Sequence, residues 1–442
     1  MSIDSRWRAW RTVGLILAAV AGLSILVAAC GDDDGDDGGG GGEGDGANLA
    51  CGLGNGEPAS GQPIKIGAIA TQQPGTDFSE GPGAVKAYFD CVNDNGGING
   101  RPLELLIETE QTDPGQIANA AVKLAETEKV LGFFGNFSII EGSVNHTFYE
   151  QNGFSVLCAG IAPEAYSTPN MACVNMGPRY SSDGAVQAVI RQDVDKVVFD
   201  QSNVPGTEYI VAGPRAVAAA EGVEFQAEAD TPPIQDAASV ALKLVQAAGP
   251  NGGVVLNFTP PEALKILQAA QQQGLADQVK AWGCSTPCNT DFVAEALDQS
   301  FDDKLLVNAE LNVTDAEDED SQLYRDVMAE YASDLPLGSF TQMGFVIGQI
   351  ATEAMLGIEG EITKESVNEA VKKVKNFRTG ILCAPWYFGD APLHIPNNID
   401  WTTTPQGGKM VIKEDCFEIS DADPDIAQVR KIEEQDPSLI GE

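Results

Sequence analysis

Histidine and positive charge are scarce in this sequence. It has two histidines, His146 and His394, and its 26 Lys and Arg stand against 65 Asp and Glu, for a net charge of −39. Two histidines far apart in the chain argue against a histidine-rich metal site and against a histidine-dependent protease site. A surface this negative repels phosphate backbones, so we expect no nucleic-acid partner.

Motifs of common enzyme classes are missing as well. The chain has no Gly-x-Ser-x-Gly elbow, no phosphate-binding loop and no His-Glu-x-x-His helix. We therefore predict that the protein is not an enzyme and that it holds no metal or cofactor. A carboxylate pair for glycoside hydrolysis stays open as an alternative, because the chain is rich in acids and nothing in it locates such a pair.

Long apolar runs are confined to the start of the chain. Basic residues at 6–11 precede the apolar stretch Thr12–Ala29, and small residues come directly before Cys30. This order is typical of a secretory signal, and its end resembles a bacterial lipobox. We predict a signal segment over 1–30, a lipid on Cys30, and an extracytoplasmic protein anchored to the outer face of the bacterial cell membrane. An uncleaved signal anchor is the alternative, since the stretch is just long enough to span a bilayer.

An acidic, glycine-rich segment follows. Residues 31–46 are almost entirely Gly, Asp and Glu. Such a composition cannot bury apolar surface and repels itself, so we predict a disordered tether over 31–62. Calcium binding is the weaker alternative, because the spacing of a calcium loop is absent.

Eight cysteines remain beside Cys30, and an even number in an exported protein indicates disulfides. Eight cysteines allow many connectivities, and we pair near neighbours. The predicted pairs are Cys51–Cys91, Cys158–Cys173, Cys284–Cys288 and Cys383–Cys416. Zinc or redox chemistry at Cys284-x-x-x-Cys288 is the alternative, but a second ligand pair is missing.

Short apolar runs alternate with helical patterns from residue 64 onward. We expect strands near 64–70, 103–108, 130–134 and 154–159, and again near 196–200, 223–229, 253–257, 279–282 and 305–309. Helical patterns separate them, and three more helices are expected between 318 and 374. This alternation predicts parallel sheets covered by helices on both faces. Two such series favour two lobes over one very wide sheet.

A glycine-rich turn connects the first helix to the second strand. Residues 93–103 read Asn-Asp-Asn-Gly-Gly-Ile-Asn-Gly-Arg-Pro-Leu, and three glycines there can take positive φ. The stretch resembles the type I periplasmic-binding-protein family, in its branched-chain amino acid and amide-binding branch. The opening strand 64–67, Asp113-Pro114 with the helix after it, 132–135 and 160–164 resemble other parts of the same family in the same order.

This resemblance implies an α/β fold of two doubly wound parallel-sheet lobes joined by a three-strand hinge. Lobe 1 would hold 63–178 and 310–379, and lobe 2 would hold 179–309 and 380–420. Residues 421–442 are polar, and we predict a loose tail there. The resemblance also implies a monomer.

The ligand of such a fold should lie beyond the carboxyl ends of the strands, where loops from both lobes meet. The loops at 71–73, 136–138, 160–162, 201–203, 258–259 and 285–286 follow predicted strands. From them we take as candidate ligand-binding residues Gln72, Gln73, Asn136, Phe137, Ser138, Gly160, Ile161, Ala162, Gln201, Asn203, Phe258, Thr259 and Ser285. Each polar one is also an ordinary turn or cap residue, and Phe137 and Phe258 fit a lobe core equally well. Tyr209 is expected to pack within the helix near 207–221.

The candidate set departs from the amino acid binders of the family. Those proteins hold the ligand carboxylate with a hydroxyl-rich turn and the ammonium with an acidic residue of the second lobe. Here the turn is reduced to Ser138, and Ser285 stands near the place of the acid. Glu141 or Glu208 are alternative counter-charges, and a neutral amide or another small polar solute fits as well as an amino acid.

Taken with the resemblance, the pattern indicates the solute-binding lipoprotein of an ABC importer. It would close around a small polar solute and deliver that solute to the permease subunits. A ligand-sensing receptor of the same fold that feeds a signalling partner is the main alternative. A surface adhesin would not need two lobes lined for a ligand.

Overall fold

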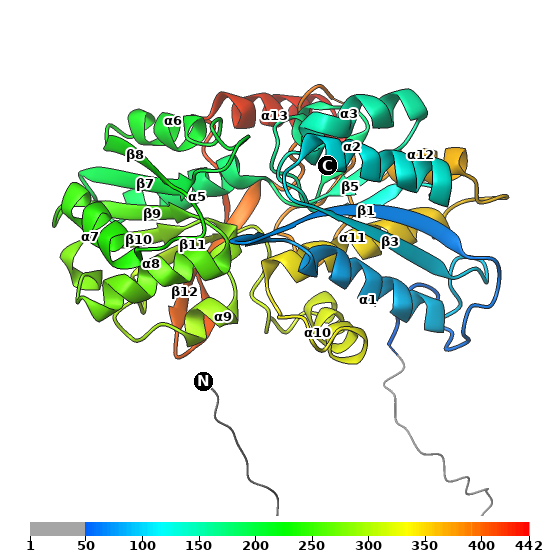
Figure 1. Cartoon of the computed structure of the whole chain (residues 1–442), viewed down its shortest axis with the longest axis horizontal. Helices are drawn as coiled ribbons and strands as arrows, with labels where there is room; N and C mark the ends of the chain where they lie inside the picture. The colour runs from blue at the N-terminus through cyan, green and yellow to red at the C-terminus, as the bar shows by residue number, and fades with distance from the viewer. Residues whose placement is uncertain (1–48, 390, 442) are drawn as a thin grey trace, which may run out of the picture. The chain divides into compact units, whose positions relative to one another are not determined.

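The computed structural model of the protein describes residues 49–389 and 391–441. The predicted signal segment, its lipidation site Cys30 and the whole acidic run at 31–46 lie outside the described residues. Within them, the order of elements is the predicted alternation of strands and helices, divided between two sheets (Figure 1).

The first sheet contains six strands in the order β2-β1-β4-β5-β6, with β3 on the other side of β1. Its strands are β1 (Ile64–Gln73), β2 (Thr76–Asp77), β3 (Leu103–Glu110), β4 (Phe133–Asn136), β5 (Val156–Cys158) and β6 (Met171–Cys173). All pairings are parallel except that of the short β2. The predicted glycine turn forms between α1 and β3, with Gly96, Gly97 and Gly100 all at positive φ.

Helices cover both faces of this sheet. One face packs against α1 (Glu80–Asp94), α10 (Glu319–Tyr331), α11 (Ser339–Leu356) and α12 (Lys364–Lys372). The other packs against α2 (Pro114–Val122), its π-helical continuation η1 (Lys123–Glu128), α3 (Glu141–Asn152) and α4 (Glu164–Ser167). Asp113 caps α2 by accepting a bond from the Gln116 N–H, and Pro114 occupies the first position, as predicted.

The second sheet contains seven strands in the order β13-β12-β11-β10-β9-β7-β8. They are β7 (Lys196–Ser202), β8 (Glu224–Asp230), β9 (Gly253–Asn257), β10 (Ala281–Cys284), β11 (Leu305–Ala309), β12 (Ile399–Gln406) and β13 (Lys409–Glu418). α5 (Pro178–Ile190) and α6 (Ala212–Ala220) cover one face, and α7 (Ala237–Ala248), α8 (Pro260–Gln272) and α9 (Asp291–Glu295) cover the other. This is the predicted class: two α/β lobes with parallel-dominated sheets.

The chain passes between the two lobes after β6, after β11 and before β12, which are the three expected passages, and a fourth time after β13. The third passage lies later than residue 380. Ile381, Leu382, Trp386 and Phe388 belong to the core of the first lobe. Their side chains are large and apolar, so this segment stays with the first core before it reaches β12.

The prediction of a loose tail over residues 421–442 is wrong. Residues Pro424–Gln435 form helix α13, which returns from β13 and packs against the first lobe. Ile426 and Val429 are fully buried there, beside Tyr180. These two residues lie three apart, so a helix places them on one face, and a largely polar segment still buries an apolar face.

The predicted tether also ends earlier than residue 62. The Ala59 N–H donates to Asn93 O at 2.7 Å, and the Gly61 N–H donates to Gly100 O at 2.8 Å. Cys51 is fully buried and joined to Cys91 of α1. Residues 49–61 are therefore fastened to the first lobe by backbone bonds, by the disulfide and by the buried side chain of Leu49.

Four disulfides are present, and they join the same cysteines that were paired from the sequence. Three of them each join two cysteines of the same lobe, two in the first lobe and one in the second. Cys383–Cys416 is different, because Cys383 follows the first-core residue Leu382 and Cys416 lies on β13 of the second sheet. It is therefore a covalent link between the two lobes.

We predict that Ile426→Ala lowers the free energy of unfolding by about 2–5 kcal/mol, because it opens a cavity in a packed core. Gln428→Ala, at an exposed position of the same helix, should change it by less than about 0.5 kcal/mol. Urea unfolding of both variants measures the difference. Equal stabilities would mean that α13 contributes nothing to the fold.

Candidate functional site

Two adjoining cavities lie between the lobes. The inner one has a volume of about 90 Å³ and the outer one about 580 Å³. They share four wall residues, Thr76, Thr259, Pro287 and Phe340. Ligand sites in proteins are typically concave, largely apolar spaces with a few polar groups, and the inner cavity has that character.

The inner cavity lies where parallel strands end. Ser202 is the last residue of β7, Asn257 is the last of β9, and Glu310 directly follows β11. Side chains of the first lobe close the opposite side. The remaining polar wall residues are Thr76, Asn175, Ser181, Thr207 and Thr259, and the apolar ones are Phe78, Ile139, Ile161, Pro178, Val204, Ile210, Phe258, Pro287, Phe340 and Met343, with Gly177 between them.

A buried polar network supports this site from the hinge side. The Ser181 and Thr286 hydroxyls lie 2.8 Å apart, and the Thr286 hydroxyl donates to Asn308 O at 3.0 Å. The Asn308 amide donates to Asp400 Oδ2 at 2.6 Å. Because these residues come from α5, the short helix η3 (Thr286–Cys288), β11 and β12, the network holds three chain passages in register.

Among the described residues, Glu310 is the one ionisable side chain in the wall of the inner cavity. It is 2% exposed. Burial raises the pKa of its carboxyl to about 8, although the Met176 N–H, which donates to Oε2, opposes this shift. At neutral pH burial therefore favours the neutral form of this carboxyl in the empty site, and a cationic partner would favour the charged form.

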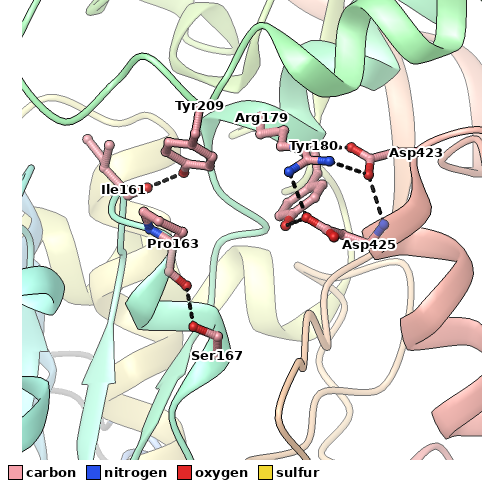
Figure 2. Close-up of polar contacts among 8 residues, drawn as sticks. All are labelled: Ile161, Pro163, Ser167, Arg179, Tyr180, Tyr209, Asp423 and Asp425. Carbon is pink, nitrogen blue, oxygen red and sulfur yellow. Dashed lines mark hydrogen bonds and ion pairs between the residues drawn. The ribbon is translucent and has the colours of Figure 1, made fainter.

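Direct hydrogen bonds close the two lobes on each other beside the cavity. The Tyr209 hydroxyl donates to Ile161 O (Figure 2). The Thr259 hydroxyl donates to Gly75 O at 3.3 Å. In each pair one residue belongs to the first lobe and the other to the second, so the structure is a closed form. Tyr209 was expected to pack within a helix. It lies before α6, and its hydroxyl forms one of the bonds between the lobes.

An ion-pair cluster fixes the first passage between the lobes (Figure 2). Arg179, next to the wall residue Pro178, donates two bonds of 2.7 Å to Asp423 and lies 2.7 Å from Asp425. Burial lowers the pKa of Arg179, but the bonds to Asp423 outweigh it and the net shift is upward. The start of α5 is thereby tied to the start of α13.

Three of the thirteen candidate residues line the inner cavity: Ile161, Phe258 and Thr259, and Thr259 lines the outer one too. The other ten do not line either cavity. Two of them bond at the surface, Gln72 to Asp77 and Asn203 to Thr231. Gln73 is half-buried, Ala162 is buried, and Phe137 is in the first core. The other five bond to neighbouring residues: Asn136 to Ile69 and Tyr149, Ser138 to Glu110, Gly160 to Asn175, Gln201 to Thr207, and Ser285 to Asn257.

Several of these residues lie one layer behind the cavity wall. Ser285 donates to Asn257 Oδ1 at 2.8 Å, and so orients an amide that lines the cavity. The Gly160 N–H donates to Asn175 Oδ1 at 2.9 Å. Neither Glu141 nor Glu208, the alternative counter-charges, lines a cavity. Glu141 is buried near Asn145, with burial raising its pKa.

Glu310, Asn257, Phe340 and Met343 are among the wall residues of the inner cavity that were not predicted from the sequence. The strand at 305–309 was predicted, so the rule of the carboxyl ends pointed to Glu310, but the strand was taken as a lobe boundary. Asn257 was counted within its strand. Phe340 and Met343 lie in the first turns of α11, and no local signal distinguishes them from core residues.

The chain belongs to the family described as periplasmic binding protein, which matches residues 63–436. A comparison with curated proteins finds no match. Solved structures share the fold at low identity. A branched chain amino acid ABC transporter from Thermus thermophilus with bound valine has 14% identity and a TM-score of 0.72, over 84% of this chain and 98% of that one.

Two further solved structures carry other printed ligands or names. A fatty acid ABC transporter substrate-binding protein from Thermomonospora curvata has 17% identity and a TM-score of 0.68, over 83% of this chain and 95% of that one. A solute binding protein from R. palustris in complex with benzoate has 16% identity and a TM-score of 0.67, over 80% and 96%. Identities this low establish the fold, and the ligand has to be inferred from the residues that line the cavity.

Over residues 49–389 and 391–441, every helix is too short or too polar to cross a membrane. The same residues contain no group of three or more His, Cys, Asp or Glu placed to hold a metal ion.

We predict that Tyr209→Phe shifts the protein toward an open form. The lost hydroxyl bond is worth about 0.5–1.5 kcal/mol, so the closed-to-open ratio should fall about twofold to tenfold. Small-angle scattering of the free protein measures this as a larger radius of gyration. Tyr331→Phe is the control, because its hydroxyl bonds to Asp94 within the first lobe at 3.0 Å; an equal change in both variants would contradict a role in closure.

Proposed function

We propose that the protein is the solute-binding component of an ABC importer. It would capture a small solute in the inner cavity by closure of the two lobes and hand it to the permease subunits. The observation that carries this proposal is a small, mostly apolar cavity with a few polar groups, enclosed by residues of both lobes and closed by bonds between them. A ligand that touches both lobes favours the closed form through its differential affinity.

The extracytoplasmic, lipid-anchored form is part of the same proposal. The basic, apolar and small-residue order before Cys30 supports it. The four disulfides support an oxidising compartment. We further propose a monomer, since one chain supplies both walls of the cavity. A sensing receptor would use the same closure and differ only in the partner that detects it.

Ligand binding is tested by a thermal-shift screen of amino acids, amides, amines and small organic acids. A ligand at 100 times its dissociation constant should stabilise the protein by about 2.7 kcal/mol. Ser202→Trp should abolish the shift, because the indole fills the inner cavity, whereas Glu221→Trp at an exposed position should keep it. A broad panel without any shift, or a shift that survives Ser202→Trp, would contradict binding in this cavity.

Lipid anchoring is tested with Cys30→Ser in a bacterial host. The variant should move from the membrane fraction to the soluble extracytoplasmic fraction, because no acceptor for the lipid remains. A variant that stays in the membrane fraction would instead support an uncleaved signal anchor.

A further inference from the structure

The charged residues in the walls of the two cavities are all acidic. Asp77, Glu80 and Glu262 line the outer cavity and Glu310 lines the inner one, with no Lys, Arg or His among the described wall residues. Lys265 pairs with Glu262 at 2.6 Å and so already has a partner. A ligand carboxylate would therefore enter a space that holds no cation to compensate its desolvation.

Several first-lobe donors that could hold a carboxylate are already in use. The Ser138 hydroxyl donates to Glu110 Oε1 at 2.8 Å, and the Ile139 N–H donates to Thr71 Oγ1 at 3.1 Å. Asn175 uses its amide on Gly160. An internal network thus takes the place of a carboxylate-binding turn.

Glu310 faces the opposite situation. Its carboxyl accepts the Met176 N–H and lies near the Thr286 hydroxyl, yet it lines the cavity and has no cationic partner among the residues that the structure describes. Around it the wall is apolar, with Phe78, Ile161, Phe258, Phe340 and Met343. Asn257 and Ser202 add neutral polar groups only.

We propose that the inner cavity binds a small organic cation, a primary ammonium with an apolar body, whose N–H groups donate to the Glu310 carboxylate. The apolar body lies against the phenylalanine and aliphatic side chains. This inference rests on the proposed solute-binding function and narrows its ligand from polar solutes in general to cations. A charge-assisted bond in such a dry site is stronger than one between neutral groups.

Binding should then depend on pH in a definite direction. Glu310 must be ionised to pair with the ammonium, and burial places its pKa at about 8 in the empty site. The titratable groups near it are Asp400, whose own pKa is raised first by burial and then by Glu310, and Tyr166, whose pKa is raised well above its usual range, mainly by burial. An alkylammonium stays charged up to about pH 10. Affinity should therefore rise about tenfold from pH 6 to pH 7 and level off above about pH 8.

The test compares four probes that share one branched alkyl group: 3-methylbutylamine, leucine, 4-methylpentanamide and 4-methylpentanoate. Calorimetry at pH 8.5 should give the tightest binding for the amine and none for the carboxylate. Glu310→Gln should weaken the amine at least tenfold, Glu310→Asp should keep part of its binding, and Glu80→Gln in the outer cavity should change it less than threefold. Thermal unfolding of the free variants verifies that each one folds.

Binding of the carboxylate as tightly as the amine would overturn the proposal, as would tighter binding of leucine than of the amine. An amine affinity in wild-type protein that is flat between pH 6 and pH 8 would overturn it without any variant. If another compound without a cation binds in the broad screen and Ser202→Trp abolishes that binding, the solute-binding function stands and only the cationic ligand fails. If no compound binds at all, both fail.

Discussion

The structure depends on how buried polar groups satisfy one another where the chain passes between its two sheets. Asn308 lies at this point, near the end of strand β11. Its side-chain amide donates to Asp400, and its backbone carbonyl accepts from the Thr286 hydroxyl. Asn308 Oδ1 and Asp400 Oδ1 have no hydrogen-bond partner among the described residues, and each further bond broken in such a place would cost about 1–3 kcal/mol. The network therefore fixes the relative position of three passages. Glu310, two residues beyond Asn308, reaches the cavity because of it.

The fixed position of the chain passages also explains why the cavity wall combines residues from distant parts of the chain. Parallel strands bring Ser202, Asn257 and Glu310 to one edge of the second sheet, and the first turns of α11 bring Phe340 and Met343 from the other side. Most hydroxyl and amide groups nearby are already paired within the protein. What is left for a ligand is a mostly apolar space with a few neutral polar groups and one carboxyl, so the proposed selectivity for a cation depends on a single side chain.

Much of the fold was predictable, because strand and helix periodicity are local properties. The turn at 93–103 and the cap at Asp113 were located from residue types alone, and the disulfides from near-neighbour pairing. The site was less predictable. Loop tips such as Asn136 and Ser138 have the composition of ligand contacts, yet they bond to Ile69 and Glu110 inside the lobe. The tail was misjudged because two apolar residues in an acidic helix are enough to bury it against a core.

The disulfide Cys383–Cys416 gives the two-lobed molecule a mechanical property that its non-covalent contacts do not. It ties a loop of the first core to the outermost strand of the second sheet, and hydrogen bonds can break during opening where this bond holds. The opening motion of the lobes then has a fixed limit on the side of this disulfide. In the proposed extracytoplasmic location such bonds form after export, so the range of motion would be set only when the protein reaches that compartment.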